Sequence, residues 1–376
     1  MTKDVVLVGF KRSAFQAAHK GAFTKMRPDD LLAEVIKALL SETKVDPTQI
    51  EDVVVGNAFP EAEQGFNIGK IVGQIVGLPD TVAGVTVNRF CGSSMQAIHN
   101  AAALIMAGSG EAYIAGGVES MTRVPMGGYN PMPNPKLMET YPQAYISMGI
   151  TAENVGKKHN ISRAEQEEFA VASHAKAAAA QAAGKFDDEI VEIAGVKTDG
   201  TIRAETTTEI LSGLKPAFDE KGTVTAGTSS PLTDGAAATL VCSLEFAKKH
   251  GLKPLAKIRS MAVSGCAAEL MGLGPVGATN KALERAGLKL DDMDIVELNE
   301  AFGAQSLGVL RELTIASDRV NIDGGAIALG HPLGASGVRI TAKAASLLQR
   351  EGKKYALATM CIGGGQGIAT VLERVE

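Results

Sequence analysis

The first third of the chain alternates short apolar runs with an amphipathic stretch. Leucine, valine and isoleucine recur every three or four positions in 28–42, which predicts a helix with one buried face. Short apolar runs predict three strands, at residues 4–9, 52–55 and 113–115. Arg12 and Ser13 predict a loop after the first of them. Strands that alternate with helices favour an α/β fold with mostly parallel pairing.

A second group of predicted elements surrounds a glycine- and serine-rich turn. Residues 83–88 predict a strand, and apolar residues at helical spacing in 95–105 predict a helix soon after it. A Gly- and Gln-rich segment, 64–77, predicts another helix upstream. Gly116 and Gly117 predict that the strand before them ends in a turn.

The pattern of the first third returns near the carboxyl end. Residues 278–302 repeat the order of 33–59, which is a helix, a short acidic spacer, a strand and an asparagine. Asn57 and Asn299 occupy matching places, and a strand predicted at 356–360 continues the second copy. An internal repeat of this length indicates two related halves in a pseudo-twofold pair.

Cys91 and His331 lie at equivalent points of the two copies. Cys91 comes 34 residues after Asn57, and His331 comes 32 residues after Asn299. We therefore expect each of the two residues to follow a strand and to precede a helix.

The first copy contains an insertion of about 110 residues after Glu119, before a strand predicted at 237–242. It opens with a Pro-, Gly- and Met-rich stretch and then predicts a long helix at 162–183. This helix has a capping box and a glycine stop, at Ser162, Glu165 and Gly184. The predicted division is an N-terminal half, an inserted loop domain and a C-terminal half, at 1–120 with 222–252, 121–221 and 253–376.

Composition excludes several classes of protein. The net charge of −5 argues against general nucleic-acid binding, and no apolar run reaches the roughly 18 residues of a membrane span. The four cysteines are far apart and none is in a CxxC pair, so neither a disulfide framework nor a metal site is expected. The N-terminus has no signal-peptide pattern, and we expect a cytoplasmic protein.

Cys91 is the first candidate for chemistry. It stands at a strand-to-helix turn, NRFCGSS, where free backbone amides and the helix dipole are expected to stabilise a thiolate. The alternative is a small buried hydrophobic residue, which describes most intracellular cysteines.

Three further stretches favour the catalytic interpretation. His331 is enclosed by glycines in GGAIALGHPLGASG, before a helix predicted from Val338 onward; Asn299 belongs to NEAF at a strand end. Cys361 opens CIGGGQG, whose unshielded amides could face an oxyanion. Two thiols, an imidazole and an amide on glycine-rich turns suit acyl transfer between thioesters with carbon–carbon cleavage or formation.

These motifs resemble those of the thiolase family over essentially the whole chain. NRFCGSSMQA, TVTAGTSSPLTDGAAA, NEAF, GGAIALGHPLGASG and CIGGGQG occur in the family's order and spacing. The resemblance implies a duplicated βαβαβαββ layered core with a loop domain inserted in the first half.

The resemblance also implies roles for individual residues. Cys91 is then the nucleophile that attacks the 3-keto carbon of a 3-ketoacyl-CoA, activated by His331, and Cys361 is the second acid and base. Asn299 and His331 form one oxyanion hole, the first through a held water. The amides of Cys91 and Gly363 form the other.

Coenzyme A is implied as a co-substrate, without a bound cofactor or a metal. The insertion is expected to bind it, and the predicted contacts are Met148 and Lys215 of the insertion together with Ser230 and Phe302. Lys215 differs from the arginine frequent at that position in the family, and lysine lacks the planar fork of arginine. Ser147 and the GTSSP segment resemble the degradative thiolases of fatty-acid β-oxidation.

Several alternatives remain at this stage. A biosynthetic acetoacetyl-CoA thiolase would use the same residues in the reverse direction. A decarboxylating ketoacyl synthase would not need Cys361, and a non-catalytic acyl-CoA binding protein would not need the catalytic set. As partners, the resemblance implies acyl-CoA and CoA, a homodimer or homotetramer, and a possible multifunctional β-oxidation enzyme.

Overall fold

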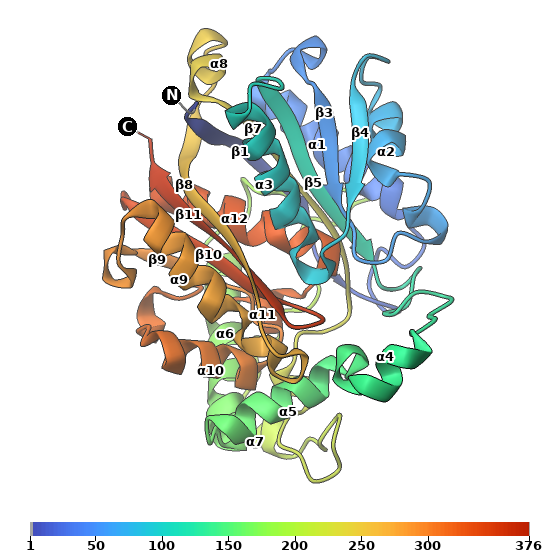
Figure 1. Ribbon diagram of the computed structural model, residues 1–376, viewed down its shortest axis with the longest axis vertical. Coiled ribbons are helices and arrows are strands. Elements are labelled where there is room, and N and C mark those ends of the chain that lie inside the picture. The colour runs from blue at the N-terminus through green and yellow to red at the C-terminus, as the bar shows by residue number, and fades with distance from the viewer. Residues whose placement is uncertain (1–2, 376) are drawn as a thin grey trace.

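A computed structural model of the chain describes residues 3–375, and its centre is one continuous sheet (Figure 1). The strand order is β4-β3-β5-β7-β1-β8-β11-β10-β9, with β2 paired to β7 and β6 paired to β1. The strands are β1 Val5–Ser13, β2 Gln16–Ala17, β3 Asp52–Gly56, β4 Ala83–Val87, β5 Ala112–Ser120, β6 Ile190–Val191, β7 Thr233–Ser243, β8 Pro254–Gly265, β9 Ile295–Leu298, β10 Tyr355–Ile362 and β11 Gln366–Arg374.

Helices form three layers around the two halves of this sheet. In the central layer, α3 and α12 contact one another and strands of both halves, while α1 and α2 cover the outer face of the first half, and α9 and α10 that of the second (Figure 1). The helices are α1 Pro28–Thr43, α2 Ile68–Val76, α3 Ser93–Met106, α4 Pro135–Thr140, α5 Met148–Lys158, α6 Arg163–Ala182, α7 Thr208–Ser212, α8 Leu244–Lys249, α9 Gly274–Ala286, α10 Gly303–Leu313, α11 Ala326–Leu329 and α12 Leu333–Arg350.

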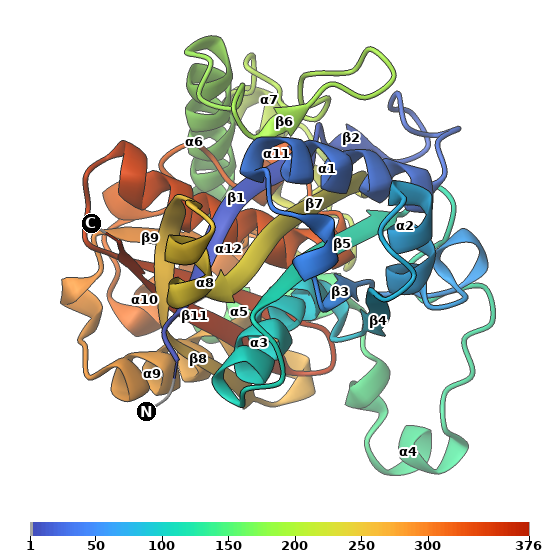
Figure 2. The same ribbon diagram turned by 90° about the horizontal axis from the view of Figure 1, so that it is seen from above.

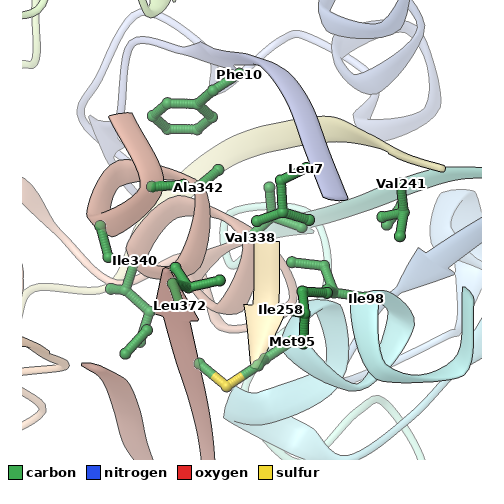
Figure 3. Close-up of a cluster of buried hydrophobic side chains, with 14 of the residues drawn as sticks. Leu7, Phe10, Met95, Ile98, Val241, Ile258, Val338, Ile340, Ala342 and Leu372 are labelled. Atoms are coloured by element: carbon green, nitrogen blue, oxygen red, sulfur yellow. The ribbon is translucent and has the colours of Figure 1, made fainter. Parts of the chain in front are cut away.

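The central helices and the two sheet halves enclose one apolar cluster (Figure 3). Leu7 of β1, Ile98 of α3 and Val338 of α12 meet there and are fully buried. Burial of one such side chain contributes about 1.5–3 kcal/mol to stability. The cluster therefore holds the starts of α3 and α12 in fixed positions, and both candidate catalytic loops lie at those starts.

The predicted repeat is present in the fold. The series α1, a 3₁₀ turn and β3 corresponds to the series α9, a 3₁₀ turn and β9. In the sheet, β3 pairs in parallel with β5, and β9 pairs in parallel with β10. The match ends before the histidine. The partner of β9 that would match β4 is only an isolated bridge between Val296 and Val320, and α11 precedes His331.

The prediction that His331 follows a strand is therefore wrong, and a buried carboxylate explains why. Glu300 accepts hydrogen bonds from the side chain of Asn321 (2.7 Å) and from the backbone N–H of Ile327 (3.2 Å). The chain must turn around this carboxylate to make both bonds, and it forms α11 there instead of a second extended segment.

Two glycines predicted to form a turn lie inside β5 instead. A Cβ atom at Gly117 would be 2.1 Å from the carbonyl oxygen of Gly334 and 2.5 Å from Cβ of Ser94. Gly117 thus allows the starts of α3 and α12 to approach the strand closely. Arg12 and Ser13, predicted as a loop, are likewise the last residues of β1.

The segment 64–77 is α-helical only from Ile68, and Gln64 ends a short 3₁₀ helix. Phe66 and Asn67 have positive φ angles of 51° and 54°, which α-helical residues do not adopt, so they form a turn before α2. Gln64 contacts the end of β5, where its side chain accepts a hydrogen bond from the backbone N–H of Ser120 at 2.6 Å.

The connection between β5 and β7 contains α4 to α7. Helix α6 begins with the predicted capping box, in which the N–H of Ser162 donates to Glu165 at 2.8 Å, and it ends before Gly184, whose φ is 69°. Arg12 of β1 joins the core to this connection through buried ion pairs with Asp199 (2.7 Å) and Glu189 (2.8 Å). Helix α4 stands apart from the layers (Figure 2). Among residues 3–375 no helix has the length and apolar content needed to cross a membrane.

Candidate active site

Cys91 lies in a single 3₁₀ turn, Phe90–Gly92, directly before α3. Ser93 fixes this turn, because its hydroxyl donates to the carbonyl of Phe90 (2.6 Å) and accepts from the N–H of Arg89 (2.9 Å). Partly buried Cys91 packs against a small apolar cluster that includes Ala58 and Leu333. It therefore faces both the loop after β3 and the first residue of α12.

His331 is held on both ring nitrogens. Its Nε2 lies 3.3 Å from Nδ2 of Asn299, and its Nδ1 lies 2.5 Å from the hydroxyl of Ser336. An amide nitrogen can only donate, so Nε2 accepts and the ring proton is on Nδ1. The hydroxyl of Ser336 accepts a hydrogen bond from that N–H and donates one to the carbonyl of Pro332 at 3.1 Å. Nε2 is thus unprotonated, and the electron pair that accepts from Asn299 is the one with which it could act as a base.

Ser336 was not among the residues predicted from the sequence. It occupies the first turn of α12, five residues after His331, and is fully buried. The sequence carries a usable signal, since a helix begun at Leu333 brings Ser336 back toward the preceding loop. We predicted that the helix starts at Val338, which left Ser336 in the preceding loop, so its proximity to His331 was not predicted.

Cys361 is the last residue but one of β10 and is fully buried in a cluster with Met148, Met271 and Phe302. The next residues contact the Cys91 turn, because a Cβ atom at Gly92 would lie 2.6 Å from the side chain of Ile362, and one at Gly363 would lie 3.6 Å from the ring of Phe90. The end of β10 and the loop after it therefore bring the second thiol close to the turn that carries the first.

The two thiols and the imidazole are all uncharged in the free site. Burial raises the pKa of Cys91 to about 11, although the N–H groups of Gly363 and Cys91 act in the opposite direction. Burial also raises the pKa of Cys361 well above its usual value, and burial and the charge of Arg339 lower the pKa of His331 to about 3. The predicted stabilised thiolate is therefore wrong for the free enzyme: the amides face the sulfur as expected, but desolvation outweighs them.

Glu119 is a second residue that the sequence-based prediction missed as part of the site. It is fully buried at the end of β5 and accepts hydrogen bonds from the N–H groups of Ala58 (2.8 Å) and Gly334 (2.9 Å) and from the side chain of Gln64 (2.9 Å). One carboxylate thus ties the loop after β3 to the first turn of α12. The signal in the sequence is a single acidic residue at the end of an apolar strand.

Three of the four predicted CoA contacts lie near the thiols. Met148 begins α5, and its sulfur would be 3.5 Å from a Cβ atom at Gly363. Phe302 pairs with Ser229 in an isolated bridge, and the N–H of Ser230 donates to the carbonyl of Ala301 at 3.0 Å.

Lys215 is exposed and farther along the same segment. The neighbouring Pro216 pairs with Thr225, five residues before Ser230. The structure thus brings together Met148, Ser230 and Phe302, while Lys215 stands at the outer end of the same loop pair.

Within residues 3–375 no group of three or more histidine, cysteine, aspartate or glutamate residues is placed to hold a metal ion. Two neighbouring cysteine turns and an imidazole with an unprotonated Nε2 define a site suited to acyl transfer through cysteine thioesters. The chain belongs to the thiolase family. It matches the thiolase N-terminal domain over residues 5–245 and the thiolase C-terminal domain over residues 252–374.

Curated relatives are similar along their whole length. A protein of Psychrobacter cryohalolentis named 3-ketoacyl-CoA thiolase is 49% identical over 99% of this chain and 98% of its own. A protein of Aeromonas hydrophila with the same name is 50% identical over 99% of this chain and 100% of its own.

Solved structures agree on the fold. Human mitochondrial 3-ketoacyl-CoA thiolase in complex with CoA superposes with a TM-score of 0.92 at 40% identity, over 100% of this chain and 98% of that one. Acetyl-CoA acetyltransferase of Bacillus anthracis gives 0.91 at 37% identity, over 100% and 99% of the two chains. The predicted α/β thiolase fold is therefore confirmed.

Proposed function

We propose that the protein is a 3-ketoacyl-CoA thiolase, which cleaves 3-ketoacyl-CoA with CoA to acetyl-CoA and an acyl-CoA shortened by two carbons. The observation that carries this proposal is the close approach of the two cysteine-bearing turns. A Cβ atom at Gly92, the residue after Cys91, would lie 2.6 Å from the side chain of Ile362, the residue after Cys361. A reaction that forms an acyl-cysteine and also moves protons to carbon and from a thiol needs both thiols.

In the first half-reaction, the sulfur of Cys91 attacks the 3-keto carbon while Nε2 of His331 takes the thiol proton. The bond between C2 and C3 then breaks, and its electron pair leaves with acetyl-CoA as an enolate. A water held by Asn299 and the protonated His331 stabilise the enolate oxygen. Cys361 donates a proton to the enolate carbon, which yields acetyl-CoA, an acyl-Cys91 thioester and a Cys361 thiolate.

In the second half-reaction, the Cys361 thiolate removes the thiol proton of a new CoA. The CoA sulfur attacks the acyl-Cys91 thioester, whose oxygen accepts the N–H groups of Cys91 and Gly363. These two groups face the sulfur of Cys91 in the free site, so they need little movement to reach the thioester oxygen. The thioester bond breaks, and Cys91 recovers its proton from His331.

The uncharged free site fits this sequence of steps. A thiol with a pKa near 11 beside an imidazole with a pKa near 3 does not exchange its proton spontaneously at neutral pH. Proton transfer becomes favourable once the sulfur bonds to carbon and the negative charge moves to the substrate oxygen. The free enzyme thus avoids an exposed reactive thiolate.

We assign the CoA moiety to the face of the inserted loop domain, 121–221, with Met148, Ser230 and Phe302 near the thioester end and Lys215 farther out. Phe302 packs edge-on against Phe218, with ring centroids 5.8 Å apart, which gives the acyl side an apolar wall. The two remaining segments, 1–120 with 222–252 and 253–376, are the proposed catalytic halves.

The proposal extends to assembly, location and pathway. Strand β4 stands at one end of the sheet order, and Phe66 beside it is 93% exposed, so we infer a homodimer, or a tetramer of two such dimers, formed across this edge. Four free cysteines support a cytoplasmic location. We infer a role in fatty-acid β-oxidation, with a multifunctional partner enzyme as a possible component of the pathway.

The test is CoA-dependent thiolysis of acetoacetyl-CoA and of a 3-ketoacyl-CoA with ten or more carbons. Cleavage of the long substrate supports the degradative enzyme. Cleavage of acetoacetyl-CoA alone would instead indicate the biosynthetic type. If both substrates bind but neither is cleaved, the protein is instead a non-catalytic acyl-CoA binding protein or a ketoacyl synthase.

A further inference from the structure

The loop that carries the N–H of Gly363 has no side chain of its own to hold it. Residues 363–365 are three glycines, and Gly364 and Gly365 have φ angles of 80° and 83°. On one side the loop is attached to the end of β8, because the N–H of Cys266 donates to the carbonyl of Gly365 at 2.8 Å. Glycine loses more conformational freedom on folding than any other residue, so the other side of this loop also needs a contact that fixes it.

That contact comes from Gln366, the first residue of β11. In the hairpin of β10 and β11 it pairs with Ile362, and its side chain donates to the carbonyl of Gly363 at 3.4 Å. The same side chain accepts a hydrogen bond from Nη1 of Arg89 at 2.9 Å. One amide side chain therefore joins the glycine loop to a guanidinium two residues before Cys91.

Arg89 belongs to the turn that carries Cys91 and is held there by backbone hydrogen bonds. Its N–H donates to the hydroxyl of Ser93 at 2.9 Å, and its carbonyl accepts the N–H of Gly92 at 3.0 Å. Its Nε also donates to Oε1 of Gln96 on α3 at 2.8 Å. The guanidinium thus binds α3 with one nitrogen and the hairpin of β10 and β11 with another, and it connects segments that are 277 positions apart in the chain.

The Cys91 turn is strained where it faces the glycine loop. Phe90 has a φ of 42°, which is rare for a bulky residue and persists only where neighbouring groups hold it. Its ring lies 3.6 Å from the position of a Cβ atom at Gly363. The two turns therefore touch, and the hydrogen bond from Arg89 to Gln366 is a polar connection across that contact.

The relative position of these turns matters for the proposed reaction. When the sulfur of Cys91 adds to a carbonyl, negative charge develops on one oxygen, which the N–H groups of Cys91 and Gly363 must reach together. Each donor has to lie about 2.7–3.1 Å from that oxygen. A shift of about 1 Å between the two turns would therefore remove one of the two donors.

We propose that Arg89 is a positioning residue: through Gln366 it fixes the N–H of Gly363 relative to that of Cys91, so that both donate to the oxygen of the intermediate on Cys91. Arg89 acts through Gln366 and not by contact with the substrate. The inference rests on the proposed thiolase function, because it concerns an oxyanion hole of that reaction.

A purely structural role for Arg89 makes a different prediction. If the guanidinium only stabilised the fold, its loss would impair every reaction of Cys91 alike. Alkylation by iodoacetamide forms no oxyanion, because the sulfur displaces iodide from carbon directly while the thiol proton goes to a base. The same sulfur and the same base, His331, serve in acylation. The ratio of the acylation rate to the alkylation rate therefore isolates the placement of the two N–H groups.

The experiment compares Arg89→Met, Gln366→Met and the double variant with the unmodified enzyme. Methionine keeps a long unbranched side chain but donates no hydrogen bond. Intact-protein mass spectrometry follows single-turnover acylation of Cys91 by a 3-ketoacyl-CoA without added CoA, and peptide mapping follows alkylation of Cys91 by iodoacetamide. Each single variant should slow acylation about 10- to 100-fold and change alkylation less than about threefold.

The two substitutions should not be additive, because each breaks the same connection. Arg285→Met is the matched control. Nη1 of Arg285 on α9 donates to the carbonyl of Met261 on β8 at 2.6 Å, so this substitution also removes a hydrogen bond between a helix and a strand. Its acylation and alkylation rates should both equal those of the unmodified enzyme.

Each outcome decides the inference. Unchanged acylation in Arg89→Met, equal losses in acylation and alkylation, or additive losses in the double variant would overturn it while the proposed function stands. An unmodified enzyme that is neither acylated nor active in thiolysis would refute the function instead. If Arg89→Met does not fold, the comparison of the two rates in Gln366→Met decides alone.

Discussion

The hydroxyl of Ser336 lies 2.5 Å from Nδ1 of His331, the imidazole that we propose as the base, and holds the proton on that nitrogen. Ser336 belongs to the same helix start that carries His331, so the base and the group that orients it move together. Glu119 attaches that helix start to the loop after β3, next to Cys91. The geometry of thiol and base thus depends on two buried polar residues that do not touch the substrate.

The variant Ser336→Ala tests the first of these dependences. Loss of the acceptor for the Nδ1 proton should lower kcat by about 10- to 100-fold, with little change in KM, because orientation of the base and not binding is impaired. Steady-state thiolysis measures both constants. Ser94→Ala is a matched control, since Ser94 accepts a hydrogen bond from Val338 of the same helix at 2.9 Å without reaching the imidazole. Equal kcat losses in both variants would contradict the proposed role.

The two reactive thiols should separate the two half-reactions. Cys91→Ala should form no acyl adduct with acyl-CoA. Cys361→Ala should be acylated on Cys91 but turn over at least about 10³-fold more slowly, because the enolate then lacks its acid. Intact-protein mass spectrometry detects the adduct. Cys242→Ala, at a buried cysteine of β7, should behave like the unmodified enzyme. Normal turnover in Cys361→Ala would remove that thiol from the mechanism.

We expect that the protein does not tolerate even the isosteric replacement of Glu119 by glutamine. Both of its oxygens accept N–H groups, so the amide nitrogen in Glu119→Gln must face a donor. We expect a loss of about 1–3 kcal/mol in the free energy of unfolding by urea, together with reduced kcat. Glu34→Gln, which alters an exposed pair with Lys37, should stay within about 0.5 kcal/mol. Unchanged stability in Glu119→Gln would show that this carboxylate is not the link we infer.

A buried histidine far from the thiols should make stability depend on pH. His99 bonds to Thr370 at 2.8 Å, and burial lowers its pKa to about 3, against about 6.5 in an unfolded chain. Between these values the unfolded chain binds one more proton than the folded protein, so acidification below about pH 6.5 removes stability at up to about 1.4 kcal/mol per pH unit.

The variant His99→Gln removes this contribution. From pH 7 to pH 5 its unfolding free energy should therefore fall by about 2 kcal/mol less than that of the unmodified protein. Thr370→Val breaks the same bond without removing the titrating group, so it should lower stability by similar amounts at both pH values. Parallel pH curves for His99→Gln and the unmodified protein would refute the expectation.

The sequence was sufficient for features that depend on neighbouring residues. The capping box of α6 and the repeated order of helix, turn and strand need only local contacts. Glycine-rich motifs marked Cys91, His331 and Cys361, which the fold brings to the starts of the two central helices and the end of β10.

Features that depend on distant partners were not predictable in this way. Gly117 resembles a turn residue until Gly334, more than two hundred positions later, is placed against it. Arg12 resembles a loop residue until Asp199 and Glu189 are seen around it. The charge state of Cys91 was wrong for the same reason, because burial is a property of the assembled layers.

Strand β1 has a consequence for how the chain is synthesised. Its sheet partners β6, β7 and β8 follow much later in the chain and begin at residues 190, 233 and 254. Because β1 pairs with both β7 and β8, it also joins the first half of the sheet to the second. Synthesis must proceed from Ser13 to Ile190 before β1 acquires its first strand partner, and until then its apolar surface is open to chaperones and to misassociation with other nascent chains.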